Sequence, residues 1–328
     1  MIGDGMGLGQ VTAAMYSQKE ALSLESFPVI GFHKSYAASN LVTDSAAGAT
    51  AFACGIKTYN NAIGVGLDSL ARFTILEEAE QKGLATGLIA TASIVHATPA
   101  SFAAHQPMRI FYERIAEDFA SANIDLLIGG GKKYFDRRKM DDQNLVDTLK
   151  AHNGLVRDFL YYDLDQTWPD IDKNFIYFTA DDNPLPVSHG RSYLSYASKM
   201  ACRFLHAKSK DKGFFLMIEG SQIDWANHAN EGNLMIRETL DFDRAIGEVL
   251  RFAKQRGNTL VIVTADHESG GVAINGRKKR GALETVFTTN GHTASLVPVY
   301  AYGPNAKVFS GIYENTAIYY KMRDFLGW

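Results

Sequence analysis

Short apolar runs alternate along this chain with longer segments of helical periodicity. One helix is expected at about residues 69–82 and is followed by a strand at 84–90. Another is expected at about 110–122 and is followed by a strand at 124–128. Further strands are predicted at 175–178, 214–218, 260–263 and 297–302, and long helices at about 191–207 and 233–255. Alternation of this kind favours parallel strand pairing. The sequence therefore predicts an α/β fold of three αβα layers, with a central, mostly parallel sheet and helices on both faces.

The length of 328 residues allows one large domain, and we expect a single α/β domain over residues 1–328. The stretch at about 129–186 is richer in charged and turn residues and carries no dense group of metal ligands. We expect it to be peripheral.

Composition excludes several partners. The net charge of −3 gives no general electrostatic reason to bind nucleic acid or an anionic membrane. The apolar runs are shorter than the roughly 20 residues of a membrane-spanning helix. The basic run 277–280 is interpreted as a solvated hairpin tip.

Cys54 and Cys202 are expected to be buried thiols, so a zinc site here would use histidine and carboxylate ligands.

Two pairs of aspartate and histidine suggest metal binding. Asp266 and His267 follow the β-branched run 259–264, where a strand ends and open α/β sheets place their chemistry. Asp224 and His228 stand four residues apart, which places both on one face of a helix. Either pair alone is weak evidence, because an Asp/His pair on a helix is more often a surface hydrogen bond. Together they suggest two metal ions.

The opening glycines surround Asp4. Glycines alternate at positions 3, 5, 7 and 9, but Leu8 or Gln10 occupies the sixth position of a dinucleotide-binding fingerprint, so that interpretation fails on spacing. Asp4, held where the backbone can approach closely, is instead expected to bridge two cations. An aspartate in an ordinary turn is the simpler alternative.

Ser45 opens a run of small residues that is expected to start a helix at or near the serine. The positive helix end would then face Ser45. Such a serine is most often only a helix cap. As a nucleophile it would need activation, and a metal that lowers the hydroxyl pKa is the more economical activator, because no Ser-His pair with its own orienting acid is evident nearby.

These motifs together resemble the alkaline phosphatase family. The resemblance rests on segments in family order over nearly the whole chain: Gly3-Asp4-Gly5-Met6-Gly7, Thr43-Asp44-Ser45-Ala46-Ala47-Gly48, His96-Ala97-Thr98-Pro99-Ala100, Glu219-Gly220, Asp266-His267-Glu268-Ser269-Gly270-Gly271 and Gly291-His292-Thr293. It implies metal-dependent hydrolysis of small phosphate monoesters through a phosphoserine intermediate at Ser45, with release of inorganic phosphate and an alcohol.

The resemblance also implies two Zn²⁺ ions and one Mg²⁺ ion. One zinc would be held by Asp224, His228 and His292. The second would be surrounded by Asp4, Asp266, His267 and the Ser45 oxygen. Asp4 would reach the magnesium together with Thr98 and Glu219, which are hard oxygen ligands. Arg109 falls at the family position of the phosphate-clamping arginine.

Three residues beside these ligands have less settled roles. His96 and Trp225 stand where an aspartate and a lysine are found in some family members. His96 is either a ligand or neighbour of the third metal, or a satisfied core histidine. Trp225 supplies no cation to phosphate, so weaker product binding is expected. Glu268 either orients His267 or is a solvated loop carboxylate.

The resemblance raises three questions of context. The chain opens inside the first motif, so we expect the first sheet strand to be lost or severely shortened, a signal peptide to be missing, and Asp4 to lie near a frayed terminus. Family members are typically exported, which implies a periplasmic or extracellular location for the parent protein. They are commonly homodimers, although the short peripheral segments here would equally suit a monomer.

Other functions stay open as alternatives. A phosphodiesterase or nucleotide pyrophosphatase of the same superfamily more often uses threonine as its nucleophile. A sulfatase is disfavoured, because its nucleophile lies in a Cys/Ser-x-Pro-x-Arg setting, whereas Ser45 precedes Ala46 and Ala47. The alternative of a different class is a truncated, inactive metal-binding protein.

Overall fold

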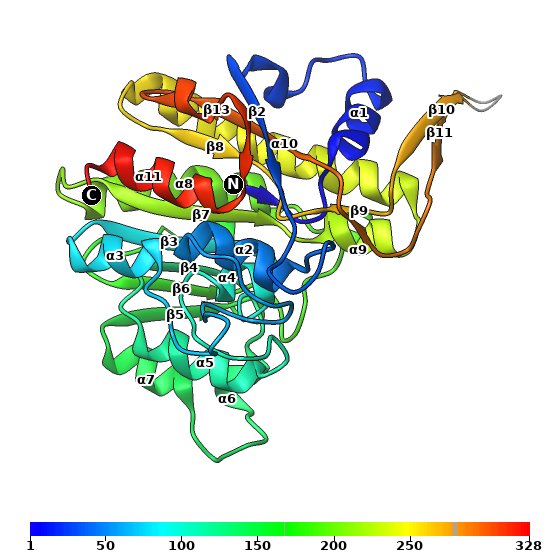
Figure 1. Ribbon diagram of the computed structural model, residues 1–328. Helices are drawn as coiled ribbons and strands as arrows, with labels where there is room; N and C mark the ends of the chain where they lie inside the picture. The colour runs from blue at the N-terminus through cyan, green and yellow to red at the C-terminus, as the bar shows by residue number, and fades with distance from the viewer. Residues whose placement is uncertain (167, 278–280) are drawn as a thin grey trace.

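The computed structural model describes residues 1–166, 168–277 and 281–328 (Figure 1). The basic run predicted at a hairpin tip therefore lies largely outside the described residues. Its flanks are β10 (Ala273–Arg277) and β11 (Leu283–Val286), which form an antiparallel pair that extends from the body of the protein.

The order of elements is mixed α and β throughout. The other strands are β1 (Ile2–Gly3), β2 (Val29–Lys34), β3 (Ala85–Ser93), β4 (Leu126–Gly130), β5 (Gly154–Asp158), β6 (Asn174–Phe178), β7 (Phe214–Gly220), β8 (Val261–Val263), β9 (Glu268–Ser269), β12 (His292–Thr293), β13 (Val297–Tyr302) and β14 (Gly311–Glu314). The helices are α1 (Leu8–Ser17), α2 (Ser45–Cys54), α3 (Ile75–Gln81), α4 (Ala97–Ala100), α5 (Tyr112–Ser121), α6 (Lys133–Asp136), α7 (Leu145–Ala151), α8 (Tyr193–Lys208), α9 (Gln222–His228), α10 (Gly232–Arg256) and α11 (Thr316–Leu326).

The central sheet is built from two groups of strands that meet at β1. Within the described residues, one group has the order β1-β7-β3-β4-β6-β5, and all its pairings are parallel. The other has the order β14-β2-β13-β8, in which β13 is antiparallel to both of its neighbours. Ile2 pairs in parallel with Thr264, directly after β8, so β1 joins the two groups. The predicted mostly parallel sheet is confirmed.

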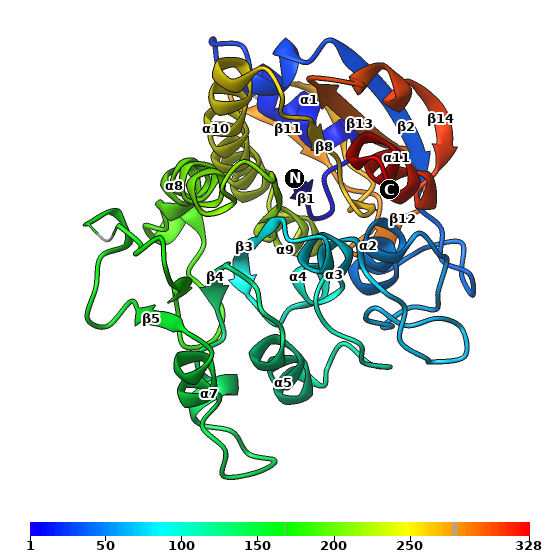
Figure 2. The ribbon, with the colours of Figure 1, turned by 90° about the vertical axis from the view of Figure 1, so that its left-hand side faces the viewer.

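Helices cover both faces of this sheet. In Figure 2, α1, α8 and α10 lie on one side, and α2, α3, α5 and α11 lie on the other. Each face has its own buried cluster, and β3 supplies both of them: Leu88 and Ala90 pack on one face, while Ile89 packs on the other. β3 is buried along its whole length. Because alternating side chains of a strand point to opposite faces, such a strand requires cover on both. The predicted three-layer architecture is therefore confirmed.

Most predicted elements are present, with one clear error. The helix expected at 69–82 begins only at Ile75, because Thr74 caps it: the Thr74 hydroxyl accepts a hydrogen bond from the Glu77 N–H at 3.1 Å, and the Glu77 carboxylate accepts one from the Thr74 N–H at 2.7 Å. This reciprocal capping box fixes the start of the helix. Cys54 and Cys202 are free, buried thiols, as predicted.

The first strand is short, yet its end is firmly held. β1 has two residues, and the Met1 amino group donates a hydrogen bond to the Ile262 carbonyl at 2.7 Å. The Thr264 N–H donates to the Met1 carbonyl at 3.0 Å. Asp4 is fully buried. These contacts differ from the frayed surroundings expected for Asp4, because strands on both sides hold the short segment in place.

Residues 129–186 supply β5, β6, α6 and α7 at the β5 edge of the sheet, beyond β4 and away from β1. Among the described residues, no helix combines the length and the apolar character needed to cross a bilayer.

A buried ion cluster ties α10 to the loop before α8. The Arg191 guanidinium donates hydrogen bonds to Glu238 and to Asp241, the latter at 3.0 Å, and the side chains of all three residues are at most 3% exposed. Removing the cation would leave two carboxylates facing each other away from water. The exposed Arg244 also contacts Asp241, at 3.0 Å, but its own side chain is 58% exposed.

We therefore expect Arg191→Leu to lower the free energy of unfolding by about 3–5 kcal/mol, as is typical when one partner of a buried ion pair is removed. Arg244→Ala is the matched control, since it removes an exposed contact to the same aspartate and should cost no more than about 1 kcal/mol. Urea unfolding followed by circular dichroism measures both. Equal effects of the two substitutions would contradict this account of the cluster.

Candidate active site

The predicted site residues meet at the carboxyl edge of the sheet, around β1. Asp4 follows β1, Glu219 lies at the end of β7 opposite Ile2, and Asp266 follows β8. Since β1 is parallel to both neighbours, the three carboxylates emerge at the same edge. This is where open α/β sheets place their chemistry.

Helix α2 brings Ser45 to this edge. Asp44 caps the helix, and its side chain accepts a hydrogen bond from the Ala47 N–H at 3.0 Å. Gly48 allows α2 to lie close to the loop that carries Asp266, because a Cβ atom at this position would lie only 3.0 Å from the Asp266 carbonyl oxygen. Ser45 is the first residue of the helix, as predicted, and it is 2% exposed. The positive helix end therefore faces the carboxylates.

The Ser45 hydroxyl lies among possible metal-ligand atoms from two other segments. Its oxygen is 3.3 Å from His267 Nε2, and 3.4 Å and 3.5 Å from the two carboxylate oxygens of Asp4. His267 Nε2 is in turn 3.4 Å from the Asp266 carboxylate and 3.5 Å from that of Asp4. Asp4, Asp266 and His267 thus form one group of donor atoms that lie within 4.8 Å of one another.

A second group contains Asp224, His228 and His292. Asp224 and His228 lie on α9, as predicted, and His228 Nε2 is 3.2 Å from the Asp224 carboxylate and 3.1 Å from His292 Nε2. The Nδ1 atoms of both rings face backbone carbonyls, that of Asn290 at 2.6 Å and that of Thr43 at 2.9 Å. Both Nε2 atoms are therefore directed inward, as in histidine ligands held by a backbone hydrogen bond.

The two groups are in contact. The rings of His267 and His292 are stacked, with centroids 3.6 Å apart. Asp224 is buried, whereas the His228 side chain is 40% exposed, so the second group opens toward solvent.

A third group contains Asp4, His96 and Glu219. Both carboxylate oxygens of Glu219 and the Thr98 hydroxyl are buried with no hydrogen-bond partner among the described residues. Buried polar atoms are rarely left in this state unless a ligand, water or ion satisfies them. Since these atoms are hard oxygen donors, the group suits a cation such as Mg²⁺. Asp4 belongs to both this group and the first.

The pKa shifts of the site carboxylates also favour the binding of cations. Burial, followed by the nearby charge of Asp266, raises the pKa of Asp4 well above its usual range, and burial raises the pKa of Glu219 to about 8. Burial also opposes ionisation of Asp224, but its hydrogen bond with His228 and the neighbouring imidazoles hold the pKa of Asp224 below its usual range. The hydrogen bond to Asp224 raises the pKa of His228 to about 9. Cations would offset the mutual repulsion of the buried carboxylates.

Arg109 lies beside this cluster. Its guanidinium donates to Asp44 at 3.1 Å and is 3.3 Å from His96 Nε2. Burial and the adjacent Arg109 charge lower the pKa of His96 to about 3, so the ring is neutral. Trp225 meets the His96 ring edge-on, with centroids 5.8 Å apart.

Glu268 is buried and braces the surrounding loops. It accepts hydrogen bonds from Gln10 at 3.0 Å, from the N–H groups of Gly271 and Val272, and from Thr293.

The neighbour of His267 Nδ1 is instead Ser269, whose hydroxyl lies 3.2 Å away and also donates to Asp224. Sequence reasoning missed Ser269. The available signal was its spacing, since it stands two residues after His267, at the end of the short strand β9.

A family model and the sequences of known proteins identify the same family. The alkaline phosphatase family model matches residues 1–286 and 278–328. Alkaline phosphatase 3 of Bacillus subtilis is 34% identical, over 97% of this chain and 86% of that protein. The alkaline phosphatase of Escherichia coli is 31% identical, over 100% of this chain and 85% of that protein.

Solved structures agree. The alkaline phosphatase of the Antarctic bacterium TAB5 superposes with a TM-score of 0.93 at 42% identity and covers 100% of this chain and 96% of its own. A histidine-to-glutamate variant of that enzyme, which superposes with a TM-score of 0.92 at the same identity and coverage, has magnesium bound.

The three donor groups predict stabilisation by divalent cations. Adding zinc and magnesium should raise the unfolding temperature, and a ligand present at 100 times its dissociation constant contributes about 2.7 kcal/mol. Asp4→Asn should remove most of this gain, because Asp4 serves two groups. Differential scanning calorimetry with and without a chelator measures the effect.

The control is Asp68→Asn, which changes an exposed carboxylate paired with Arg72. It should leave the gain from cations intact. A gain that survives Asp4→Asn in full would argue against cations at the sheet edge.

Proposed function

The chain belongs to the alkaline phosphatase family and hydrolyses phosphate monoesters, and we propose that Ser45 is the nucleophile of this reaction. The observation that carries the proposal is the position of the Ser45 hydroxyl. It stands at the positive end of α2 and within 3.5 Å of both Asp4 and His267. A hydroxyl that must become nucleophilic needs activation by a neighbouring base or by a metal ion, and Asp4 and His267 are side chains that can accept a proton or hold such an ion.

In the proposed reaction, the Ser45 hydroxyl loses its proton and its oxygen forms a bond to phosphorus as the bond between phosphorus and the alcohol oxygen breaks. The departing oxygen takes up a proton and leaves as the alcohol. The serine then carries the phosphoryl group. Water cleaves this ester and releases inorganic phosphate, which regenerates the serine hydroxyl. The N–H groups at the start of α2 that Asp44 does not engage would face the phosphoryl oxygens, since a helix N-terminus is a ready anion site.

Arg109 is proposed to clamp the nonbridging phosphate oxygens. Its guanidinium is oriented by Asp44 and by the neutral His96, which leaves a planar fork of donors fixed beside Ser45. Such a fork matches two phosphate oxygens at once. Asp44 therefore has two tasks: it caps α2 and it holds the arginine.

The family uses metal cofactors, and we propose two zinc ions and one magnesium ion for this chain. Asp224, His228 and His292 would hold one zinc, and Asp4, Asp266, His267 and Ser45 the other. Asp4, Thr98 and Glu219 would hold magnesium, with His96 beside them. Bound cations would lower the pKa of a hydroxyl and neutralise charge that develops on oxygen. The donor sets support this choice, because imidazole suits zinc and hard oxygen ligands suit magnesium.

We also propose, from family membership, that the protein is a homodimer that acts outside the cytoplasm. Sedimentation of the purified protein and fractionation of the source cells test these two points.

Ser45→Ala should lower the hydrolysis of an aryl phosphate monoester by about 10³-fold or more, because the nucleophile is lost. Chelation should abolish the activity of the unmodified chain, and zinc with magnesium should restore it. Acid quenching should trap phosphoserine at position 45 only where the serine is present. Ser26→Ala, an exposed serine, is the control. Turnover by Ser45→Ala within tenfold of the unmodified chain would exclude this serine as the nucleophile, and faster turnover of a diester would favour the phosphodiesterase alternative.

Trp225 provides a separate test of the phosphate site. Trp225→Lys should tighten competitive inhibition by inorganic phosphate by about threefold to tenfold, because it adds a partly exposed cation beside His96 and Arg109. Trp225→Phe keeps an aromatic ring without the charge and should leave the inhibition constant nearly unchanged. Equal inhibition constants for the lysine and phenylalanine variants would refute the idea.

A further inference from the structure

The segment 105–109, which ends at the proposed phosphate clamp Arg109, pairs with the loop 61–64. Ile63 and Gln106 exchange two backbone hydrogen bonds, both of 2.9 Å, and the pairing is antiparallel. A displacement of the loop would therefore also move the backbone that carries the arginine.

Asn61 of this loop connects Arg109 with Asp44. Its carbonyl accepts a hydrogen bond from the Arg109 N–H at 2.8 Å, and its own N–H donates to Asp44 Oδ2 at 3.0 Å. The same Asp44 oxygen accepts a hydrogen bond from the Arg109 guanidinium at 3.1 Å. Since Asp44 also caps α2, the loop sets the position of the arginine relative to the helix that begins at Ser45.

His105 braces this loop from the opposite side. Its Nδ1 atom lies 2.8 Å from the Gly64 carbonyl oxygen, and its Nε2 atom lies 2.9 Å from a carboxylate oxygen of Glu77 on α3. A carbonyl and a carboxylate can only accept hydrogen bonds, so each ring nitrogen has to donate one. Only the doubly protonated imidazolium form of His105 satisfies both contacts.

Gly64 makes this contact possible. Its φ angle is +57°, and a Cβ atom at this position would overlap the Ala104 carbonyl oxygen and lie 2.9 Å from His105 Nδ1. The loop can approach the ring because glycine has no side chain and tolerates the positive φ angle. The Gly64 N–H donates in turn to the Thr50 hydroxyl of α2 at 3.0 Å. The His105 ring is therefore connected to α2 through this glycine.

The charged groups that face the His105 ring favour its charged form. Among the described residues they are Glu77 from α3 and Asp118 from α5, and the Asp118 carboxylate also accepts a hydrogen bond from the His105 N–H at 2.9 Å. Burial opposes the charge, but the hydrogen bonds to Glu77 and Gly64 and the two carboxylates raise the pKa of His105 above its ordinary value of 6.5. The contribution of the charged ring to stability is therefore complete well below pH 6.5 and is lost as the pH rises through the raised pKa.

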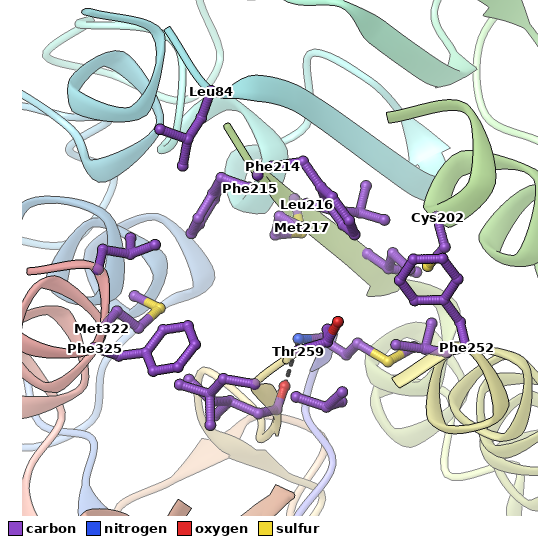
Figure 3. A pocket seen from close by; sticks show the side chains of 18 of the residues that line it. Leu84, Cys202, Phe214, Phe215, Leu216, Met217, Phe252, Thr259, Met322 and Phe325 are labelled. Carbon is purple, nitrogen blue, oxygen red and sulfur yellow. Dashed lines mark hydrogen bonds between the residues drawn. The ribbon is translucent and has the colours of Figure 1, made fainter. Parts of the chain in front are cut away.

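Apolar packing holds the start of the same segment. Phe102 lies beside Phe215 of β7, with ring centroids 6.1 Å apart, and both line an apolar cavity of about 410 Å³ (Figure 3). Contacts of this kind are non-directional. The directed hydrogen bonds of His105 are therefore needed to orient the chain on its way from Phe102 to Arg109.

We propose that His105 is a positioning residue, which as an imidazolium between Gly64 and Glu77 holds the loop 61–64 and thereby places the Arg109 guanidinium for phosphate. This role rests on the proposed function of Arg109 as the phosphate clamp. His105 acts through the arginine and belongs to none of the three donor groups. Loss of one ring proton leaves a bare nitrogen facing a carboxylate, which loosens the loop and weakens the binding of phosphate.

A double-mutant cycle between His105→Gln and Arg109→Ala tests this role, with the competitive inhibition constant of inorganic phosphate as the measurement. With Arg109 present, His105→Gln should raise this constant by about threefold to tenfold, because one amide nitrogen does not replace two donors on opposite sides of a ring. With Arg109→Ala already in place, His105→Gln should change it by less than about twofold. The control is His152→Gln, which removes an exposed histidine whose ring faces the Ala120 carbonyl and should have no effect in either background.

The cycle separates two kinds of failure. An inhibition constant that Arg109→Ala leaves unchanged would count against the arginine clamp of the proposed function, and with it against any positioning role. If Arg109→Ala weakens phosphate binding but His105→Gln has the same effect in both backgrounds, His105 acts independently of the arginine and its positioning role is overturned.

Glu77→Gln provides a second test that preserves the start of α3. The amide oxygen can still accept the hydrogen bond from the Thr74 N–H, and the amide nitrogen can donate to a neutral His105 ring. Both contacts of the ring are then kept without a charge. The inhibition constant of the unmodified protein, divided by that of Glu77→Gln, should therefore rise as the pH passes through the pKa of His105. The ratio cancels the titration of phosphate and of the metal ligands, and a ratio that stays constant across this pKa would refute the proposal.

The unmodified protein supplies a measurement that depends on no variant. Nitrogen NMR of the histidine rings should show that the His105 ring carries both protons in most molecules at pH 6.5, and that the pKa lies above this value. A ring that is mainly neutral at pH 6.5 would contradict the imidazolium brace directly.

Discussion

The mutual repulsion of buried carboxylates is the constraint around which this structure is arranged. Asp4, Glu219 and Asp266 are all fully buried and emerge at one edge of the sheet. Like charges at such short range destabilise one another unless they are neutralised by protons or cations. The imidazoles, the start of α2 and Arg109 supply part of the positive potential. The negative charge that these groups leave uncompensated can be neutralised by divalent cations, and the carboxylates and imidazoles lie in groups that could hold such ions.

A second constraint is steric, because the start of α2 must fit against the edge of the sheet where these side chains are packed. The run of small residues in α2 lets the helix lie against the loop after β8, and Gly48 meets Asp266 at a distance that a larger side chain would not permit. The serine, the carboxylates and the histidines come from segments far apart in the sequence. Their convergence follows from parallel strands that end at one edge and from one helix that begins there.

The sequence predicted the parts of the fold that depend on local pattern. Continuous apolar runs marked β3, β4 and β7, and the spacing of Asp224 and His228 placed both on one turn of α9. β2, β5 and β14 were not predicted, because none of them is buried along its length and they lack a continuous apolar run. The start of α3 was missed because a capping box at Thr74 outweighed helical periodicity before it. Ser269 was not predicted because its partners, Asp224 and His267, come from two elements that only the tertiary fold brings together.

The stacked rings of His267 and His292 belong to two different donor groups, yet they touch face to face. A close-packed contact of this kind transmits small displacements, because neither ring can tilt without pushing the other. The positions of the two groups of metal-ligand side chains are therefore coupled through these two rings. A change in the geometry around one imidazole therefore also displaces the other ring.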